Sequence, residues 1–199
     1  MTAVIRINAS RPSAAGIKKA ALVLKKGGLV VFPTETVYGL GANLLDKKAV
    51  EKIYEIKKRP RNKPLTVHVA DTASVRKIVG KIPPGAGKLI ERYWPGPLTI
   101  ILRDRRGGKT GFRMPDNKIA FDLIKKAGVP VVAPSANISG NKPPTSAKEA
   151  LRDLDGKVDI VIDGGRTAIG VESTVVDMTG RRPKILREGA ISKAEIERI

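Results

Sequence analysis

The chain has 199 residues, which suits one substantial domain. It has no cysteine and one histidine, which excludes disulfides, thiolate metal sites, cysteine nucleophiles and histidine-rich metal sites. Lys and Arg number 38 against 19 Asp and Glu, and the resulting charge of +19 favours a polyanionic partner such as RNA or nucleotide phosphates over a merely soluble surface.

Strand-like and helix-like segments alternate along the chain. Ser13 and Asp46 are placed to cap helices, Gly27-Gly28 ends the first helix, and the segment Arg103–Gly111 is predicted to be a basic loop. In chain order, we predict strands at 4–7, 29–32, 65–69, 98–102, 129–133, 159–162, 174–177 and 184–186, and helices at 14–26, 47–57, 71–79, 84–93, 118–127 and 192–199.

This alternation indicates an α/β domain. Strands cluster at both ends of the chain and some connections are too short for helical crossovers, so we expect an open, twisted, mixed sheet flanked by helices. A single domain over residues 1–199 is expected, with no additional C-terminal domain. No apolar stretch approaches the ~20 residues that span a bilayer, and the first residues lack a signal-peptide pattern, so we expect a cytoplasmic protein.

Three polar segments follow predicted elements, where α/β sheets tend to hold ligands. Pro33–Gly41 contains two threonines, a glutamate, a tyrosine and two glycines, which is more hydrogen-bonding capacity than a turn needs. Lys57–Pro64 crowds five cations, which suits phosphate binding, although cations at a helix C-terminus also complement its dipole. Val131–Gly140 places small hydroxyl and amide groups after an apolar strand, as a cradle for anionic oxygens or as a turn before two prolines.

Single residues give weaker signals. His68 lies in a predicted strand, where a lone histidine is more often structural, and Arg113 beside a proline-restricted backbone could hold a carboxylate. Ser173 begins a predicted strand and Arg187 ends another. The sequence has no Walker P-loop, and Ser135 lacks the flanking glycines of a nucleophile elbow.

Considered together, the motifs form an ordered series. The K-x-R…S-x-N pattern is present as Lys57, Arg59, Ser135 and Asn137. From about Gly27 to Ile191, the chain resembles the YrdC-like family, the threonylcarbamoyl-AMP synthases. The matching segments are Pro33–Gly41, Lys57–Pro60, Pro64–His68, Trp94–Thr99, Arg113–Pro115, Pro134–Gly140, Glu172–Asp177 and Arg187–Ala190.

The resemblance implies an open α/β fold with a basic concave face and a catalytic core at about residues 27–191. It implies a reaction in which L-threonine, bicarbonate and ATP give L-threonylcarbamoyladenylate and pyrophosphate. A downstream threonylcarbamoyl-transferase complex then modifies tRNA, which this chain could itself contact. Mg²⁺ is expected to accompany ATP by bridging its phosphates, with no metal ligands from the protein.

The resemblance also assigns roles to ten residues. It places ATP on Lys57, Arg59, Arg61, Ser135, Asn137 and Arg187, of which Lys57, Arg59, Ser135 and Asn137 are the expected catalytic residues. It places threonine on Thr34, His68, Arg113 and Ser173, with Arg113 on the threonine carboxylate.

Two other functions compete with this interpretation. A non-enzymatic module that binds tRNA or double-stranded RNA would explain the charge but not the polar segments around Thr34 and Ser135. Few aromatics, 4% of the chain, argue against stacking on single strands. A carbamoyl-transfer domain like that of hydrogenase-maturation proteins would share the fold, but those are much longer chains with zinc-binding cysteines.

Overall fold

The protein is described by a computed structural model that covers residues 1–180 and 182–199, in which ten strands are interspersed with seven helices. In chain order they are β1 (Ala3–Arg6), α1 (Ala14–Lys25), β2 (Val30–Phe32), β3 (Gly39–Asn43), α2 (Lys47–Lys57), β4 (Thr66–His68), α3 (Thr72–Val79), α4 (Pro84–Tyr93), β5 (Leu98–Arg103), β6 (Lys109–Arg113), α5 (Lys118–Ala127), β7 (Val131–Val132), α6 (Ala147–Leu154), β8 (Ile160–Asp163), β9 (Thr174–Asp177), β10 (Lys184–Arg187) and α7 (Lys193–Glu197).

The strands form one open, mixed sheet in the order β1-β8-β2-β3-β7-β4-β6-β5-β9-β10. The β8 strand runs parallel to both β1 and β2, whereas β3 is antiparallel to β2 and to β7. From β7 to β10 the pairing alternates between antiparallel and parallel: β4–β7, β5–β6 and β9–β10 are antiparallel, and β4–β6 and β5–β9 are parallel. The predicted mixed sheet with flanking helices is therefore confirmed.

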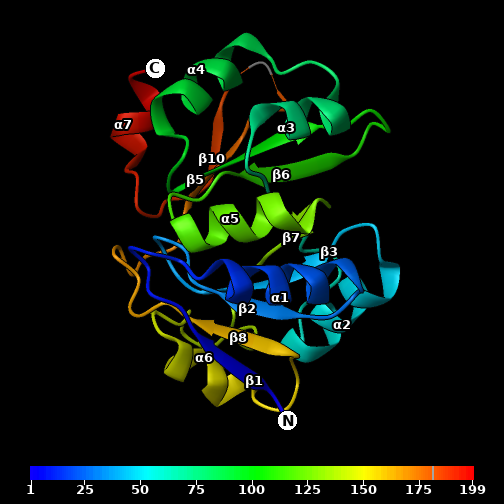
Figure 1. Cartoon of the computed structure of the whole chain (residues 1–199). Coiled ribbons are helices and arrows are strands. Elements are labelled where there is room, and N and C mark those ends of the chain that lie inside the picture. The colour runs from blue at the N-terminus through cyan, green and yellow to red at the C-terminus, as the bar shows by residue number, and fades with distance from the viewer. Residues whose placement is uncertain (181) are drawn as a thin grey trace.

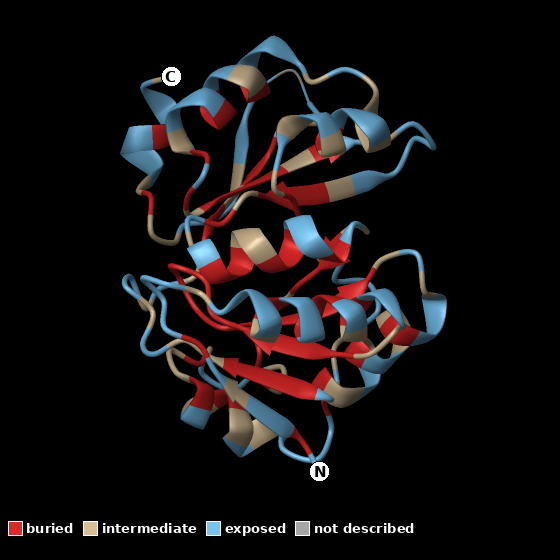
Figure 2. Ribbon diagram, in the orientation of Figure 1, coloured by how far each residue is buried: buried red, intermediate tan, exposed pale blue. Residues whose placement is uncertain are grey.

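Helices cover both faces of this sheet and enclose two apolar clusters. Helices α1 and α5 lie side by side over one face, where Leu24 and Leu123 pack against Phe32 (Figure 1). The other cluster joins α2, α3, α4, α6 and α7 to the opposite face, with Ile53 and Val31 among its members. Burial is concentrated along the central strands, and the outer sides of the helices are exposed (Figure 2).

The predicted helix caps are present. Ser13 accepts a hydrogen bond from the backbone N–H of Gly16, and Asp46 accepts from those of Lys48 and Ala49. Each cap satisfies backbone donors that the first turn of a helix leaves without partners. The sequence therefore specifies where α1 and α2 begin.

Three elements differ from the prediction. The glycine-rich stretch after Tyr38 continues as β3, and a Cβ at Gly41 would lie 2.8 Å from the Phe32 ring, so the glycine lets β2 and β3 pack closely. The predicted loop Arg103–Gly111 contains most of β6, because Asp104 closes a tight turn by accepting from the N–H groups of Arg106 and Gly108. Helix α6, capped by Ser146, was not predicted.

In the described part of the chain, no helix has the length and apolar character needed to cross a membrane.

Candidate functional site

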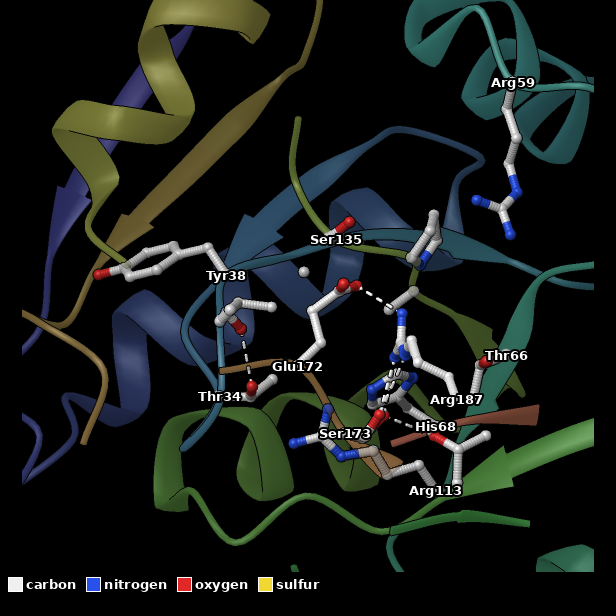
Figure 3. Close-up of a pocket in the computed structure, with 15 residues that line it drawn as sticks. Thr34, Tyr38, Arg59, Thr66, His68, Arg113, Ser135, Glu172, Ser173 and Arg187 are labelled. Atoms are coloured by element: carbon white, nitrogen blue, oxygen red, sulfur yellow. Dashed lines mark hydrogen bonds and ion pairs between the residues drawn. The ribbon is translucent and has the colours of Figure 1, made fainter. Parts of the chain in front are cut away.

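A polar cavity lies near the middle of the sheet, where segments far apart in the sequence converge (Figure 3). It holds about 570 Å³ of empty space, part of it open to solvent. Seven of the ten predicted site residues line it: Thr34, Arg59, His68, Arg113, Ser135, Ser173 and Arg187. Val37, Tyr38, Gly39, Thr66, Thr99, Ala133, Pro134 and Glu172 complete the lining.

The floor of the cavity holds a neutral histidine beside a buried ion pair. His68 on β4 is paired in register with Arg113 on β6, and both side chains are buried. Burial lowers the pKa of His68 to about 3, with a further contribution from the charge of Arg113, so the imidazole is neutral at physiological pH. Its Nδ1 is buried and has no hydrogen-bond partner among the described residues, which is unusual for a buried polar atom.

The guanidinium of Arg113 is held from two sides. Its Nη2 lies 2.8 Å from Oε1 of Glu35, in an ion pair whose two side chains are only 6% and 8% exposed. Its Nε donates to the carbonyl of Gly96 at 3.3 Å. The N–H groups of Arg113 that face away from these partners are the ones that can meet an anion in the cavity (Figure 3).

Arg187 forms hydrogen bonds and an ion pair with two neighbouring residues of the lining. Its Nε and Nη2 donate to the backbone carbonyl of Ser173 at 3.2 and 2.9 Å, and its Nη1 lies 2.8 Å from Oε1 of Glu172. The Ser173 hydroxyl in turn shares a hydrogen bond of 2.9 Å with that of Thr99. A chain of polar groups from β5, β10 and the residues just before β9 thus faces the cavity.

The segment after β2 shapes the third side. The Thr34 hydroxyl lies 2.9 Å from that of Thr36 and donates to the carbonyl of Val37 at 2.7 Å. Most of its hydrogen-bonding capacity therefore fixes the turn. The Tyr38 hydroxyl donates to the carbonyl of Gly165 at 2.6 Å, and burial raises the Tyr38 pKa to about 12, so this phenol is a structural anchor.

Arg59 approaches from the turn that follows α2. Its Nε and Nη2 donate to the carbonyls of Lys63 and Pro64, each at 3.0 Å, and the guanidinium lies toward the open side of the cavity (Figure 3). Burial, with a smaller effect of Arg187, lowers the pKa of Arg59 from its usual value. Pro60 and Pro64 lie at the two ends of this turn.

Three predicted site residues lie outside the cavity. Arg61 is exposed, forms an ion pair with Glu51 and stacks over the Tyr54 ring, so the structure does not bring it to the other predicted phosphate ligands. Lys57 is 1% exposed and donates to the backbone carbonyls of Ser135 and Asn137.

Asn137 is the third of these residues. Its side-chain amide donates to the carbonyls of Ile138 at 2.9 Å and Asn141 at 2.7 Å. The amide therefore holds the Ser135–Asn141 loop from within. Of the four K-x-R…S-x-N residues, Arg59 and Ser135 line the cavity. Lys57 and Asn137 instead support the Ser135–Asn141 loop.

Sequence reasoning missed several functional candidates, of which Glu35 and Glu172 are the most informative. Both are carboxylates paired with cavity arginines. Their signal was present, because Glu35 lies inside the polar segment after β2 and Glu172 directly precedes Ser173, but which arginine each would meet depends on tertiary contacts. Thr66 and Thr99 point from β4 and β5 into the same space.

Comparison with known proteins gives a consistent result. A family model named for Sua5, YciO and YrdC and described as telomere recombination matches residues 22–189. Two curated relatives named threonylcarbamoyl-AMP synthase come from Bacillus subtilis, 46% identical, and Pyrococcus abyssi, 47% identical; each match covers 92% of this chain and 56% of the relative. The chain thus spans about half the length of these relatives. A Methanocaldococcus jannaschii protein named putative threonylcarbamoyl-AMP synthase is 38% identical, with 91% of both chains covered.

Solved structures agree with the sequence relatives. The crystal structure of P. abyssi Sua5 complexed with L-threonine superposes with a TM-score of 0.95 at 44% identity and covers 99% of this chain and 60% of its own. Escherichia coli YciO superposes with a TM-score of 0.88 at 28% identity and covers 98% and 99%. The chain therefore belongs to the Sua5/YciO/YrdC family.

Proposed function

We propose that this chain catalyses the condensation of L-threonine, bicarbonate and ATP to L-threonylcarbamoyladenylate and pyrophosphate. The observation that carries the proposal is the convergence of seven predicted site residues, from segments as far apart as Thr34 and Arg187, on one cavity. The names of the relatives support the same activity. They do not favour the alternative of a non-enzymatic RNA-binding module.

The buried floor suits the amino acid. Threonine carries a carboxylate that Arg113 can bind and an amine whose hydrogen the neutral His68 Nδ1 can accept. The Ser173 and Thr99 hydroxyls lie where small polar groups of the substrate can form hydrogen bonds. The P. abyssi Sua5 structure complexed with L-threonine supports this amino acid as a substrate.

The reaction then needs positioned charges more than covalent help. The threonine nitrogen, once deprotonated, attacks the carbon of bicarbonate, and water leaves to give a carbamate. A carbamate oxygen attacks the α-phosphorus of ATP, and the bond to the β-phosphate breaks as pyrophosphate departs. We assign Arg59 and Arg187, which line the cavity, to the phosphates and to the charge that develops on them, and the Ser135 loop to the AMP part of the nucleotide.

Magnesium is proposed to enter as the MgATP substrate, with the ion bridging phosphate oxygens. Glu172 is the carboxylate among the cavity-lining residues, and its Oε1 is paired with Arg187 at 2.8 Å. Magnesium fits this site when the phosphates supply most of its ligands. We further propose that the product passes to a downstream transferase that modifies tRNA, and direct contact with tRNA stays a prediction.

The test is pyrophosphate release by the purified chain with MgATP, requiring both threonine and bicarbonate. Arg59→Ala should lower the rate sharply because it removes a phosphate ligand, whereas Arg92→Ala, an exposed arginine on α4, should not. Near-normal release by Arg59→Ala would refute its role on the phosphates. Failure of the wild-type chain to release pyrophosphate with all three substrates would refute the proposed function itself. Carbamoyl phosphate turnover would instead favour a transferase.

A further inference from the structure

A buried lysine ties the end of α2 to the Ser135–Asn141 loop. Lys57, the last residue of α2, donates through Nζ to the backbone carbonyls of Ser135 and Asn137. The contact is reciprocal, because the N–H of Ser139 donates to the Lys57 carbonyl at 2.8 Å. Lys57 is 1% exposed and does not line the cavity.

The spacing along α2 explains why this lysine points inward. Ala49, Ile53 and Lys57 are the buried residues of the helix and recur every four positions, so they share its inner face. An ammonium group in such a position is costly unless backbone or side-chain oxygens satisfy its N–H groups. The two loop carbonyls satisfy two of its three N–H groups. Burial, followed by the charge of Arg59, lowers the pKa of Lys57 to about 8.

A second charged residue holds the same loop from the other side. Asp153 on α6 accepts through Oδ2 from the N–H of Ile138 at 2.8 Å. Both of its carboxylate oxygens also accept from the Asn141 side chain, at 3.0 and 2.9 Å. Lys57 therefore fixes the first half of the loop and Asp153 the second half.

We propose that Lys57 and Asp153 are positioning residues that together hold the Ser135–Asn141 loop in its nucleotide-binding shape. Neither is then a direct ligand of the triphosphate. This inference rests on the proposed function, because it assumes that the loop contacts the nucleotide. It assigns Asp153 to the site and gives Lys57 a different role from the phosphate binding expected from the sequence.

The opposite charges of the two residues make the proposal testable. If they acted on ATP by electrostatics, removal of Lys57 would weaken phosphate binding and removal of Asp153 would strengthen it. If they act by positioning, both removals weaken nucleotide binding. The affinities for AMP and for pyrophosphate separate the two roles further. A misplaced loop weakens the binding of AMP, whereas loss of a phosphate ligand weakens the binding of pyrophosphate.

The experiment measures the affinities of MgATP, AMP and pyrophosphate by calorimetry for Lys57→Met and Asp153→Ala of the full chain. Each variant leaves buried backbone groups without partners, so AMP and MgATP should bind roughly 10- to 100-fold more weakly, and pyrophosphate alone should bind as it does to the wild type. Hydrogen exchange of residues 135–141 in the free protein should accelerate in both. Lys52→Met and Asp155→Ala remove the same charges from exposed positions near by and should change neither measurement.

Several outcomes would overturn the inference. Loss of pyrophosphate affinity with AMP binding retained in Lys57→Met would make this lysine a phosphate ligand. Tighter or unchanged AMP binding by Asp153→Ala would show that Asp153 does not hold the loop in its nucleotide-binding shape. If the wild-type chain binds neither ATP nor AMP, the proposed function fails by that result. The inference is then decided by loop exchange, and unchanged exchange in either variant refutes it.

Discussion

The buried pair of Glu35 and Arg113 offers the sharpest test of how the cavity is built. Glu35→Gln removes the negative charge with almost no change of shape and leaves the Arg113 guanidinium buried without a counterion. Both side chains are under a tenth exposed and their charged atoms are 2.8 Å apart. Breaking a pair of this kind by removing one partner costs about 3–5 kcal/mol, because the remaining charge is desolvated and uncompensated. A domain holds about 5–15 kcal/mol in all, so the loss is large.

The assay is urea unfolding of four chains, namely wild type, Glu35→Gln, Arg113→Met and the double variant. The double variant should lose less than the sum of the two single variants, because neither charge is then left alone. Glu51→Gln serves as the matched control, since it breaks the exposed pair with Arg61 and should cost about 0–1 kcal/mol. If Glu35→Gln costs no more than this control, the pair is not desolvated and the description of the cavity floor is wrong.

Three further predictions concern the same region. His68 is the only histidine of the chain, and its pKa is lowered to about 3, so its imidazole signals in a proton NMR titration should not move between pH 8 and 5. Below about pH 6.5 the unfolded state binds a proton on this histidine and the folded state does not, so the free energy of unfolding should fall as the pH drops from 6.5 toward 3. Lys57 has a folded-state pKa of about 8 against 10.5 when unfolded, so wild type should gain stability relative to Lys57→Met as pH rises from 8 to 10.5, measured by urea unfolding. Tyr38→Phe leaves the Gly165 carbonyl without its donor and should cost about 1–3 kcal/mol in thermal or urea unfolding; a loss below 0.5 kcal/mol would show that the phenol is not an anchor.

Local sequence signals predicted most of the helices and strands, and β3 is an exception with a clear physical cause. Caps at Ser13 and Asp46 and apolar periodicity located the helices that contain several apolar residues. Strand β3 was missed because Gly39 and Gly41 give it poor intrinsic strand propensity. Its burial between β2 and β7 compensates for that propensity, and this depends on partners distant in sequence.

The composition of the site was more predictable than its geometry. Polar segments after buried strands identified Thr34 and Ser135, because residues at strand ends meet at the edge of a sheet. Arg59 was identified instead by the cluster of cations after α2. The resemblance placed Arg61 with Arg59 on ATP, but the chain turns directly after Arg59: the Lys63 N–H donates to the Pro60 carbonyl at 3.0 Å, and Arg61 pairs with Glu51. For Lys57 the signal was readable: its four-residue spacing from Ile53 put it on the buried face of α2, which argued against a position in an open cavity.

The two cavity arginines that carry ion pairs differ in what they can do with a substrate. Glu172 and Arg187 are 33% and 42% exposed, and a pair that solvent reaches is held by only about 0–1 kcal/mol. Phosphate oxygens can therefore replace Glu172 on Arg187 at little cost. The Arg113–Glu35 pair is shielded from solvent, so Arg113 keeps Glu35 and binds a second anion only through its remaining N–H groups. In the proposed reaction, a fixed arginine suits the small amino acid, which must be held in one orientation for its nitrogen to react. An exchangeable arginine suits phosphates that arrive together and leave as pyrophosphate.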